Sequence, residues 1–173
     1  AFLEQGGLRD VEAGLPVEAD TVFRIYSMTK PIVSVALLML HERGLVQLDD
    51  PLARHLPELG ELQVFAEGDT DGYRTMPVER PPTVRDLLTH TAGFTYGFLR
   101  EHPVDALYRR ERIAVTHGAG SLTEMVERLG RLPLRFQPGT RWNYSVATDV
   151  AGALVERLAG EPLDAWLVRE ILE

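Results

Sequence analysis

Ser27 and Lys30 are the two residues of this sequence whose types and spacing point most directly to catalysis. They are three positions apart, which on a helix places both side chains on one face, about one turn from each other. A neutral lysine at that distance can accept the proton of a serine hydroxyl that attacks a carbonyl carbon. The alternative is a serine that caps a helix beside a solvated lysine, so other features of the chain must decide.

Lys30 is the single lysine among 18 basic residues, and all the others are arginine. Arginine keeps its proton in proteins, whereas burial or a neighbouring charge can make a lysine neutral. A chain that uses arginine elsewhere but keeps one lysine near a serine favours acid–base chemistry at Lys30. A leftover surface lysine in an arginine-rich chain is the alternative.

The pair lies at the start of a helix that we predict over residues 27–43, ending at Gly44. Pro31 is compatible with its first turn, where amide groups have no partner inside the helix. Residues 32–40 are apolar apart from Ser34, which predicts a helix buried in the centre of a larger body. The positive end of this helix would face an incoming carbonyl oxygen, so the Ser27 N–H could serve as one oxyanion donor.

We expect strands before this helix and mainly helices after it. Residues 2–22 alternate short apolar stretches with glycine, as in a hairpin. Residues 60–82 are predicted as a loop or small insertion, and residues 93–120 as a loop rich in glycine, aromatic and charged residues. Further helices are expected from residue 50, from Thr83, from Ser121, over 147–158 and from Pro162 toward 172. The chain is therefore divided into residues 1–26, the N-terminal strands of an α/β sheet region, and residues 27–173, the nucleophile helix and helical region of the same catalytic domain.

Composition and charge exclude several classes of protein. The 173 residues, 45% hydrophobic and 25% charged, contain enough apolar material for one globular domain. A net charge of -8 argues against a nucleic acid or an anionic membrane as partner, because both require a basic face. The longest apolar run, residues 31–40, has about half of the ~20 residues that a membrane span needs.

Cysteine and histidine usage narrows the chemistry further. The sequence contains no cysteine, which excludes disulfides, cysteine-ligated zinc and cysteine nucleophiles and favours a cytoplasmic over a periplasmic or secreted protein, although the compartment stays open. Apart from His90, the histidines (His41, His55, His102 and His117) lack His-Glu-x-x-His spacing and clustered acidic partners, so neither a metal nor a cofactor is expected. No serine lies in a Gly-x-Ser-x-Gly elbow of the α/β-hydrolase type.

Three blocks of sequence carry a family resemblance. The first is residues 23–31 (FRIYSMTKP), which resembles the nucleophile segment of serine beta-lactamase-related hydrolases, most closely the family VIII carboxylesterases. The second is residues 85–93 (RDLLTHTAG), similar to the block of that superfamily in which a helix runs into a Thr/Ser-Gly turn. The third is FQPGT followed by WNYS, residues 136–145, which resembles the segment that supplies a catalytic tyrosine. Together the blocks cover the chain from about residue 20 to its end.

The resemblance implies a beta-lactamase/DD-peptidase-like fold, of the α/β (α+β) class, with penicillin-binding proteins in the same superfamily. It implies an acyl-enzyme on Ser27, with Lys30 as the base and Tyr144 as the proton relay, and a small-molecule ester or amide as substrate without a cofactor. A phenol with a pKa near ~10 suits a relay only if neighbouring cations lower that pKa. Within the second block His90 is expected to be structural and to hydrogen-bond a turn.

The chain departs from the family pattern in two places. Val146 stands where the pattern often has Asn, which favours short-chain esters over beta-lactams or D-alanyl peptides, the two alternative substrates. No Lys-Thr-Gly, His-x-Gly or Trp-Gly-Gly motif follows Tyr144, so the C-terminal sheet strands are expected to be missing and these residues alone to be inactive. A non-catalytic binding module with part of the architecture is the alternative from another class, and the oligomeric state is left open.

Overall fold

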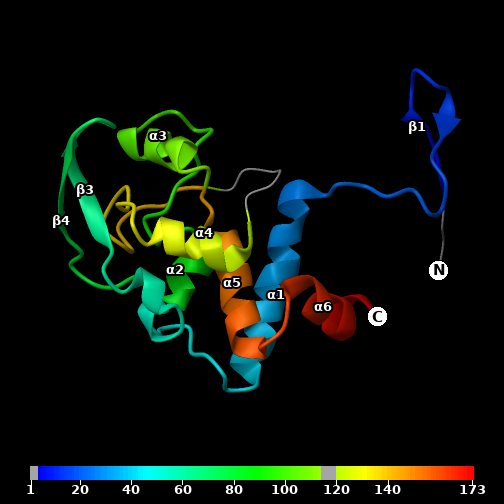
Figure 1. The fold of residues 1–173 in the computed structure, drawn as a ribbon. Helices are drawn as coiled ribbons and strands as arrows, with labels where there is room; N and C mark the ends of the chain where they lie inside the picture. Colours follow the sequence, from blue (N-terminus) through cyan, green and yellow to red (C-terminus); the bar gives the residue numbers. More distant parts are fainter. Residues whose placement is uncertain (1–3, 114–119) are drawn as a thin grey trace.

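The computed structural model describes residues 4–113 and 120–173 (Figure 1). Within these residues helices outnumber strands, and four short helical turns of 3-10 or π type are labelled η. In chain order the elements are β1 (Leu8–Asp10), β2 (Leu15–Pro16), η1 (Tyr26–Met28), α1 (Thr29–Glu42), η2 (Leu52–Arg54), η3 (Pro57–Leu59), β3 (Gln63–Gly68), β4 (Tyr73–Pro77), α2 (Val84–Leu88), α3 (Pro103–Arg110), α4 (Leu122–Leu129), α5 (Ala147–Ala159), α6 (Leu163–Leu167) and η4 (Val168–Leu172).

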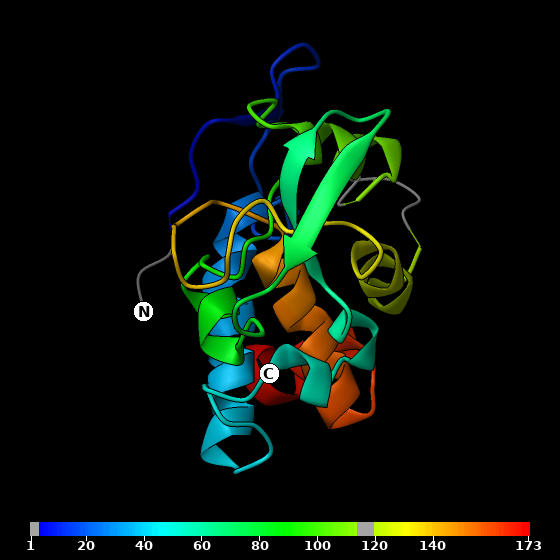
Figure 2. The ribbon, with the colours of Figure 1, turned by 90° about the vertical axis from the view of Figure 1, so that its left-hand side faces the viewer.

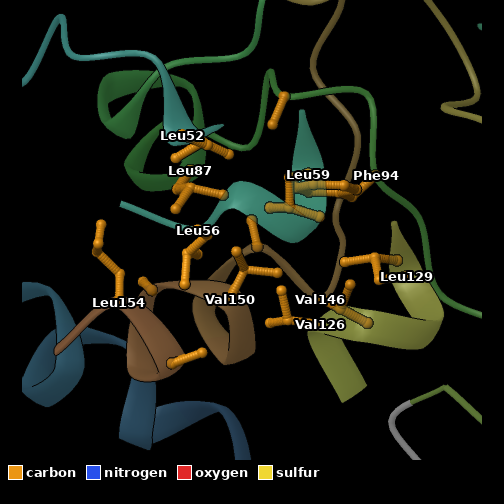
Figure 3. Packing of buried hydrophobic residues seen from close by; sticks show 14 of the residues in the cluster. Leu52, Leu56, Leu59, Leu87, Phe94, Val126, Leu129, Val146, Val150 and Leu154 are labelled. Carbon is orange, nitrogen blue, oxygen red and sulfur yellow. The ribbon is translucent and has the colours of Figure 1, made fainter. Parts of the chain in front are cut away.

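Helices α1 and α5 pack side by side at the centre of the helical region, and the two ribbon views agree on this (Figures 1 and 2). Helix α5 buries nearly its whole length from Ala147 to Val155 and ends at Gly160, whose φ of 72° is the left-handed conformation that glycine adopts readily. Around it pack α1, α2, α4 and α6. Figure 3 shows this core, with these labelled side chains: Leu52, Leu56, Leu59, Leu87, Phe94, Val126, Leu129, Val146, Val150 and Leu154.

Only one face of α1 is buried. Its buried residues recur at helical spacing and face the core: Val33, Ala36, Leu37 and Leu40. On the opposite face Val35 and Leu38 are 47% and 40% exposed. The expectation of a helix buried on all sides is therefore confirmed for one face, and within the described residues the other face is exposed.

The N-terminal hairpin is present, and a second hairpin was missed by sequence analysis. Strands β1 and β2 pair antiparallel, and their residues are exposed, away from the helices. Residues 2 and 3 of the predicted hairpin lie outside the described part of the chain. Strands β3 and β4 also pair antiparallel, so the segment 60–82, predicted as a loop or small insertion, contains a hairpin instead of a plain loop (Figure 2).

Long-range contacts explain why the β3–β4 hairpin escaped the sequence pattern. The Phe65 N–H donates to the Leu134 carbonyl at 2.9 Å, and the Leu134 N–H donates to the Gln63 carbonyl at 2.8 Å. The turn is closed locally, because the Asp69 carboxylate accepts the N–H groups of Asp71 and Gly72. Strand β3 is thus stabilised by a distant segment as well as by its own turn. Its apolar residues alternate only weakly with polar ones, so the sequence pattern does not indicate a strand.

The predicted capping boxes are confirmed and one more was overlooked. The Thr83 and Ser121 side chains each accept the N–H of the third helical residue, as expected for α2 and α4. Helix α3 lies within residues 93–120, which were predicted as a loop. Its N-cap is the His102 side chain, and the Asp105 carboxylate accepts the His102 N–H. No helix in the described residues is long and apolar enough to cross a membrane.

Candidate active site

Ser27 lies in the 3-10 turn η1, directly before α1 rather than inside it. The preceding residue, Tyr26, has a φ of 45°, a left-handed conformation that is strained for a residue with a side chain. The turn leaves Ser27 exposed, and it places Lys30 in the first turn of α1 on the same side. The Lys30 ammonium donates to the Ser27 hydroxyl at 3.4 Å. The predicted proximity of Ser27 and Lys30 is therefore observed.

Tyr144 comes to the same place from a distant part of the chain. Its hydroxyl lies 2.5 Å from the Ser27 hydroxyl, the shortest contact that Ser27 makes to another side chain in the described residues. Lys30 Nζ lies 4.7 Å from the centroid of the Tyr144 ring. The structure thus brings the three predicted site residues together, with the tyrosine hydroxyl nearer to the serine than the lysine is.

Backbone hydrogen bonds hold the segment that carries Tyr144 against the loop after α2. The Gly139 N–H donates to the Thr91 carbonyl at 2.8 Å, and the Asn143 N–H donates to the His90 carbonyl at 2.9 Å. The Asn143 side chain also donates to the Phe94 carbonyl at 3.0 Å. The second sequence block is thus hydrogen-bonded to the third, and these bonds fix the position of the segment that carries Tyr144.

The charge of Lys30 changes the acidity of the groups around it. Hydrogen bonds from Lys30 and Ser27 lower the pKa of Tyr144 below its usual value, and these outweigh the effect of its partial burial. A tyrosine relay requires a neighbouring cation that lowers the pKa of the phenol, and Lys30 is such a cation. Burial, and secondarily the Lys30 charge, lower the pKa of His90, which favours a neutral imidazole.

His90 has the structural surroundings that were expected of it. Its Nδ1 lies 3.2 Å from the Ser145 hydroxyl, and its ring packs 5.3 Å from the Tyr144 ring. His90 therefore packs against the segment that carries Tyr144 and contacts both Tyr144 and Ser145. Of the two tryptophans, Trp166 is buried in the core whereas Trp142 is 67% exposed, near the rings of His90 and Tyr144.

Two residues at the site were missed by sequence analysis. Lys30 Nζ also donates to the Tyr96 hydroxyl at 3.4 Å, and that hydroxyl donates to the Asp149 carboxylate at 3.4 Å. Asp149 lies in the first turn of α5, five positions after Tyr144, and it interrupts an otherwise largely apolar stretch. An acidic residue in an apolar helix could have been recognised in the sequence as a candidate site residue, whereas nothing in the sequence around Tyr96 singles out that tyrosine.

A cavity of about 630 Å³ opens at Ser27 and runs between α1, α4 and α5. Its polar lining includes the hydroxyls of Ser27 and Tyr144 and the ammonium of Lys30. The rest of the lining is mainly apolar and includes Val33, Leu122, Met125, Gly152 and Leu163. Among the described residues no group of three or more histidine or acidic side chains could hold a metal ion; His117 lies outside them. The site can thus activate a serine beside an apolar pocket.

Comparison with known proteins gives the same family. A model of the family described as Beta-lactamase matches residues 1–173. Esterase EstB of Burkholderia gladioli is 42% identical over 163 residues, which cover 92% of this chain and 38% of EstB. The monacolin J acid methylbutanoyltransferase of Aspergillus terreus is 36% identical over 157 residues, covering 90% of this chain and 37% of that protein.

A solved structure shows the fold. That of EstCE1, described as a hydrolase with promiscuous acyltransferase activity, superposes with a TM-score of 0.77 and 31% identity over 95% of this chain and 40% of EstCE1. The chain thus spans well under half the length of these relatives. The likeness confirms the predicted beta-lactamase/DD-peptidase-like fold, with its mixed helix and strand content. The chain belongs to the beta-lactamase family, whose members similar to it include an esterase.

Proposed function

We propose that the protein is a serine hydrolase that forms an acyl-enzyme on Ser27, with Lys30 as the base and Tyr144 as the proton relay. The observation that carries the proposal is the contact of the Ser27 hydroxyl with two proton carriers, Tyr144 at 2.5 Å and Lys30 at 3.4 Å. A serine hydroxyl needs such a partner, because it is a weak nucleophile while it keeps its proton.

The proposed steps conserve protons and charge. As Ser27 Oγ attacks the ester carbonyl, its proton passes to neutral Lys30, either directly or by way of the Tyr144 hydroxyl, which gives up its own proton to Lys30 as it accepts the new one. When the ester bond breaks, the alcohol leaves with a proton returned through Tyr144. Water then repeats the sequence on the acyl-enzyme, releases the acid and restores Ser27.

The substrate proposed is a short-chain ester. Two observations support an ester: the cavity beside Ser27 is mainly apolar, and a relative carries the name esterase. The argument from Val146 loses its force, because that side chain is fully buried in the core and lines no part of the cavity (Figure 3). Beta-lactams and D-alanyl peptides are the alternatives within the same chemistry.

Acyl transfer to an alcohol is the second candidate function. The names of the Aspergillus terreus relative and of EstCE1 both include acyl transfer. The chemistry requires only that an alcohol replaces water in the second half of the reaction, so the same three residues would serve.

A substrate panel on the full-length protein tests the proposal. Hydrolysis of p-nitrophenyl butyrate, a chromogenic cephalosporin and a D-alanyl peptide is compared, with and without an added alcohol. We expect the ester to be turned over fastest and Ser27→Ala to abolish turnover, while Ser34→Ala, the same change on α1, retains it. Faster amide than ester turnover would assign the protein to the lactamase or peptidase branch. Turnover of none of them would support the binding-module alternative.

A further inference from the structure

Lys30 is connected to a buried carboxylate that the proposed reaction does not use. The connection runs from Lys30 Nζ to the Tyr96 hydroxyl and from there to Asp149, with 3.4 Å at each step. Both distances are long for strong hydrogen bonds, but such bonds at active sites often shorten when substrate binds. We infer that Tyr96 and Asp149 form a positioning pair that holds Lys30 against Ser27 and balances the charge of Lys30 when it carries the serine proton. The inference rests on the proposed function.

The surroundings of Tyr96 fix the direction of its hydroxyl. Its ring stacks on Phe98, with the centroids 4.8 Å apart, and lies 5.3 Å from the ring of Tyr144. A ring held on both sides has little freedom to turn its hydroxyl elsewhere. Because the hydroxyl has one proton, donating it to Asp149 leaves the oxygen lone pairs for the Lys30 ammonium. The order of donors, lysine to tyrosine to aspartate, follows from these contacts.

Asp149 is the acid that faces Lys30. Of the described residues that line the cavity, it is the only aspartate or glutamate. The other titratable groups around Lys30 are Tyr144, Tyr96 and His90, none of which is negatively charged in its ordinary state at neutral pH. Burial raises the pKa of Asp149, and the Lys30 charge opposes that rise. The Lys30 charge therefore favours the ionised carboxylate of Asp149.

A purely structural role for Asp149 is the competing explanation. An acidic residue in the first turn of a helix is favoured by the helix dipole, and Asp149 occupies such a position in α5. That role would affect folding but not the pH at which the base becomes active. The pH dependence of the reaction therefore separates the two explanations.

The test uses Asp149→Asn in the full-length protein, with Asp71→Asn in the exposed β3–β4 turn as the matched control. Asparagine keeps the shape and an acceptor for Tyr96 but removes the charge. A negative charge favours the protonated form of a nearby base, so its loss should move the acid limb of the kcat/KM profile to lower pH by about one unit. A profile that superimposes on the wild type, or an acid limb that moves to higher pH, would overturn the inference.

Tyr96→Phe provides a second, independent variant, with Tyr73→Phe on β4 as its control. Tyr96→Phe removes the hydroxyl that accepts a hydrogen bond from Lys30, so kcat should fall about tenfold or more. KM should not change, because this hydroxyl acts on Lys30 rather than on the substrate. In the double variant the shift of the acid limb caused by Asp149→Asn should be smaller than in the single variant, because the two residues act on Lys30 together. Wild-type-like kcat in Tyr96→Phe, or an unchanged shift in the double variant, would contradict a pair that acts as a unit.

The rate of Ser27 labelling by a fluorophosphonate, measured against pH, keeps this test separate from the proposed function. Labelling needs an activated serine but no ester substrate. If wild-type protein labels and hydrolyses no ester, the proposed substrate is wrong, and the shift of the labelling profile in Asp149→Asn still decides the inference. If Ser27 in wild-type protein does not label at any pH, Lys30 does not activate it and both proposals fail.

Discussion

Replacing Tyr144 by phenylalanine removes one oxygen atom from the centre of the site and little else. The ring can keep its packing against His90 and Tyr96, each with its centroid 5.3 Å away. What is lost is the hydroxyl that lies 2.5 Å from Ser27 Oγ. The variant therefore separates proton transfer from packing at this position.

The expected effects on stability and on catalysis differ in size. Loss of one intramolecular hydrogen bond costs about 1 kcal/mol of folding free energy, and less at a partly exposed site. Loss of a positioned proton carrier typically lowers rates by about 10²- to 10⁴-fold, which corresponds to about 2.7–5.5 kcal/mol of transition-state stabilisation. We therefore expect kcat/KM to fall by at least about a hundredfold while thermal stability changes little.

The assay is p-nitrophenyl butyrate hydrolysis by full-length wild type, Tyr144→Phe and Tyr73→Phe, with the unfolding temperature measured on each. Tyr73→Phe makes the same chemical change on β4, outside the cavity, and should leave kcat/KM unchanged. Activity of Tyr144→Phe within about threefold of wild type would refute the relay, because that is far below the loss expected for a proton carrier. An equal loss in Tyr73→Phe would show that the effect is not specific to the site.

Three further predictions concern charge. Lys30→Arg keeps the positive charge but cannot accept a proton, so ester turnover should fall at least about a hundredfold; near-wild-type turnover would mean that Lys30 acts only through its charge. Asp86→Ala, which removes the buried carboxylate that pairs with the partly exposed Arg80 and completes the α2 capping box, should lower the free energy of unfolding by about 1–3 kcal/mol, whereas Asp71→Ala should not, as urea denaturation can show. Hydrogen bonds from the Gln47 backbone N–H and from His55 lower the pKa of Asp50 to about 2, below the unfolded value of ~3.9. The contribution of Asp50 to stability is therefore complete above pH ~3.9 and is lost as the pH falls through about 2. The stability difference between wild type and Asp50→Asn should shrink over this pH range.

The nucleophile segment was predictable because its geometry is local. Ser27 and Lys30 are three residues apart, and helical geometry alone brings their side chains to one face. Helices α2 and α4 were predictable for the same reason, since each begins with a capping box that is complete within four residues. Tyr144 was identified by resemblance rather than by physics, since no local rule places it beside Ser27.

The parts that escaped prediction depend on contacts between distant segments. Tyr96 and Asp149 meet only because the loop after α2 packs against α5. Strand β3 gains hydrogen bonds from Leu134, far along the chain, and this support has no trace in its own residues.

The central claim is a covalent acyl-enzyme on Ser27, and peptide mapping by mass spectrometry tests it directly. Full-length protein is mixed with p-nitrophenyl butyrate, quenched in acid during turnover and digested. We predict a butyryl adduct on the peptide that contains Ser27, and none on the corresponding peptide of Ser27→Ala, which should also be inactive. An adduct on Ser34, Ser121 or Ser145, or undiminished turnover by Ser27→Ala, would contradict the account.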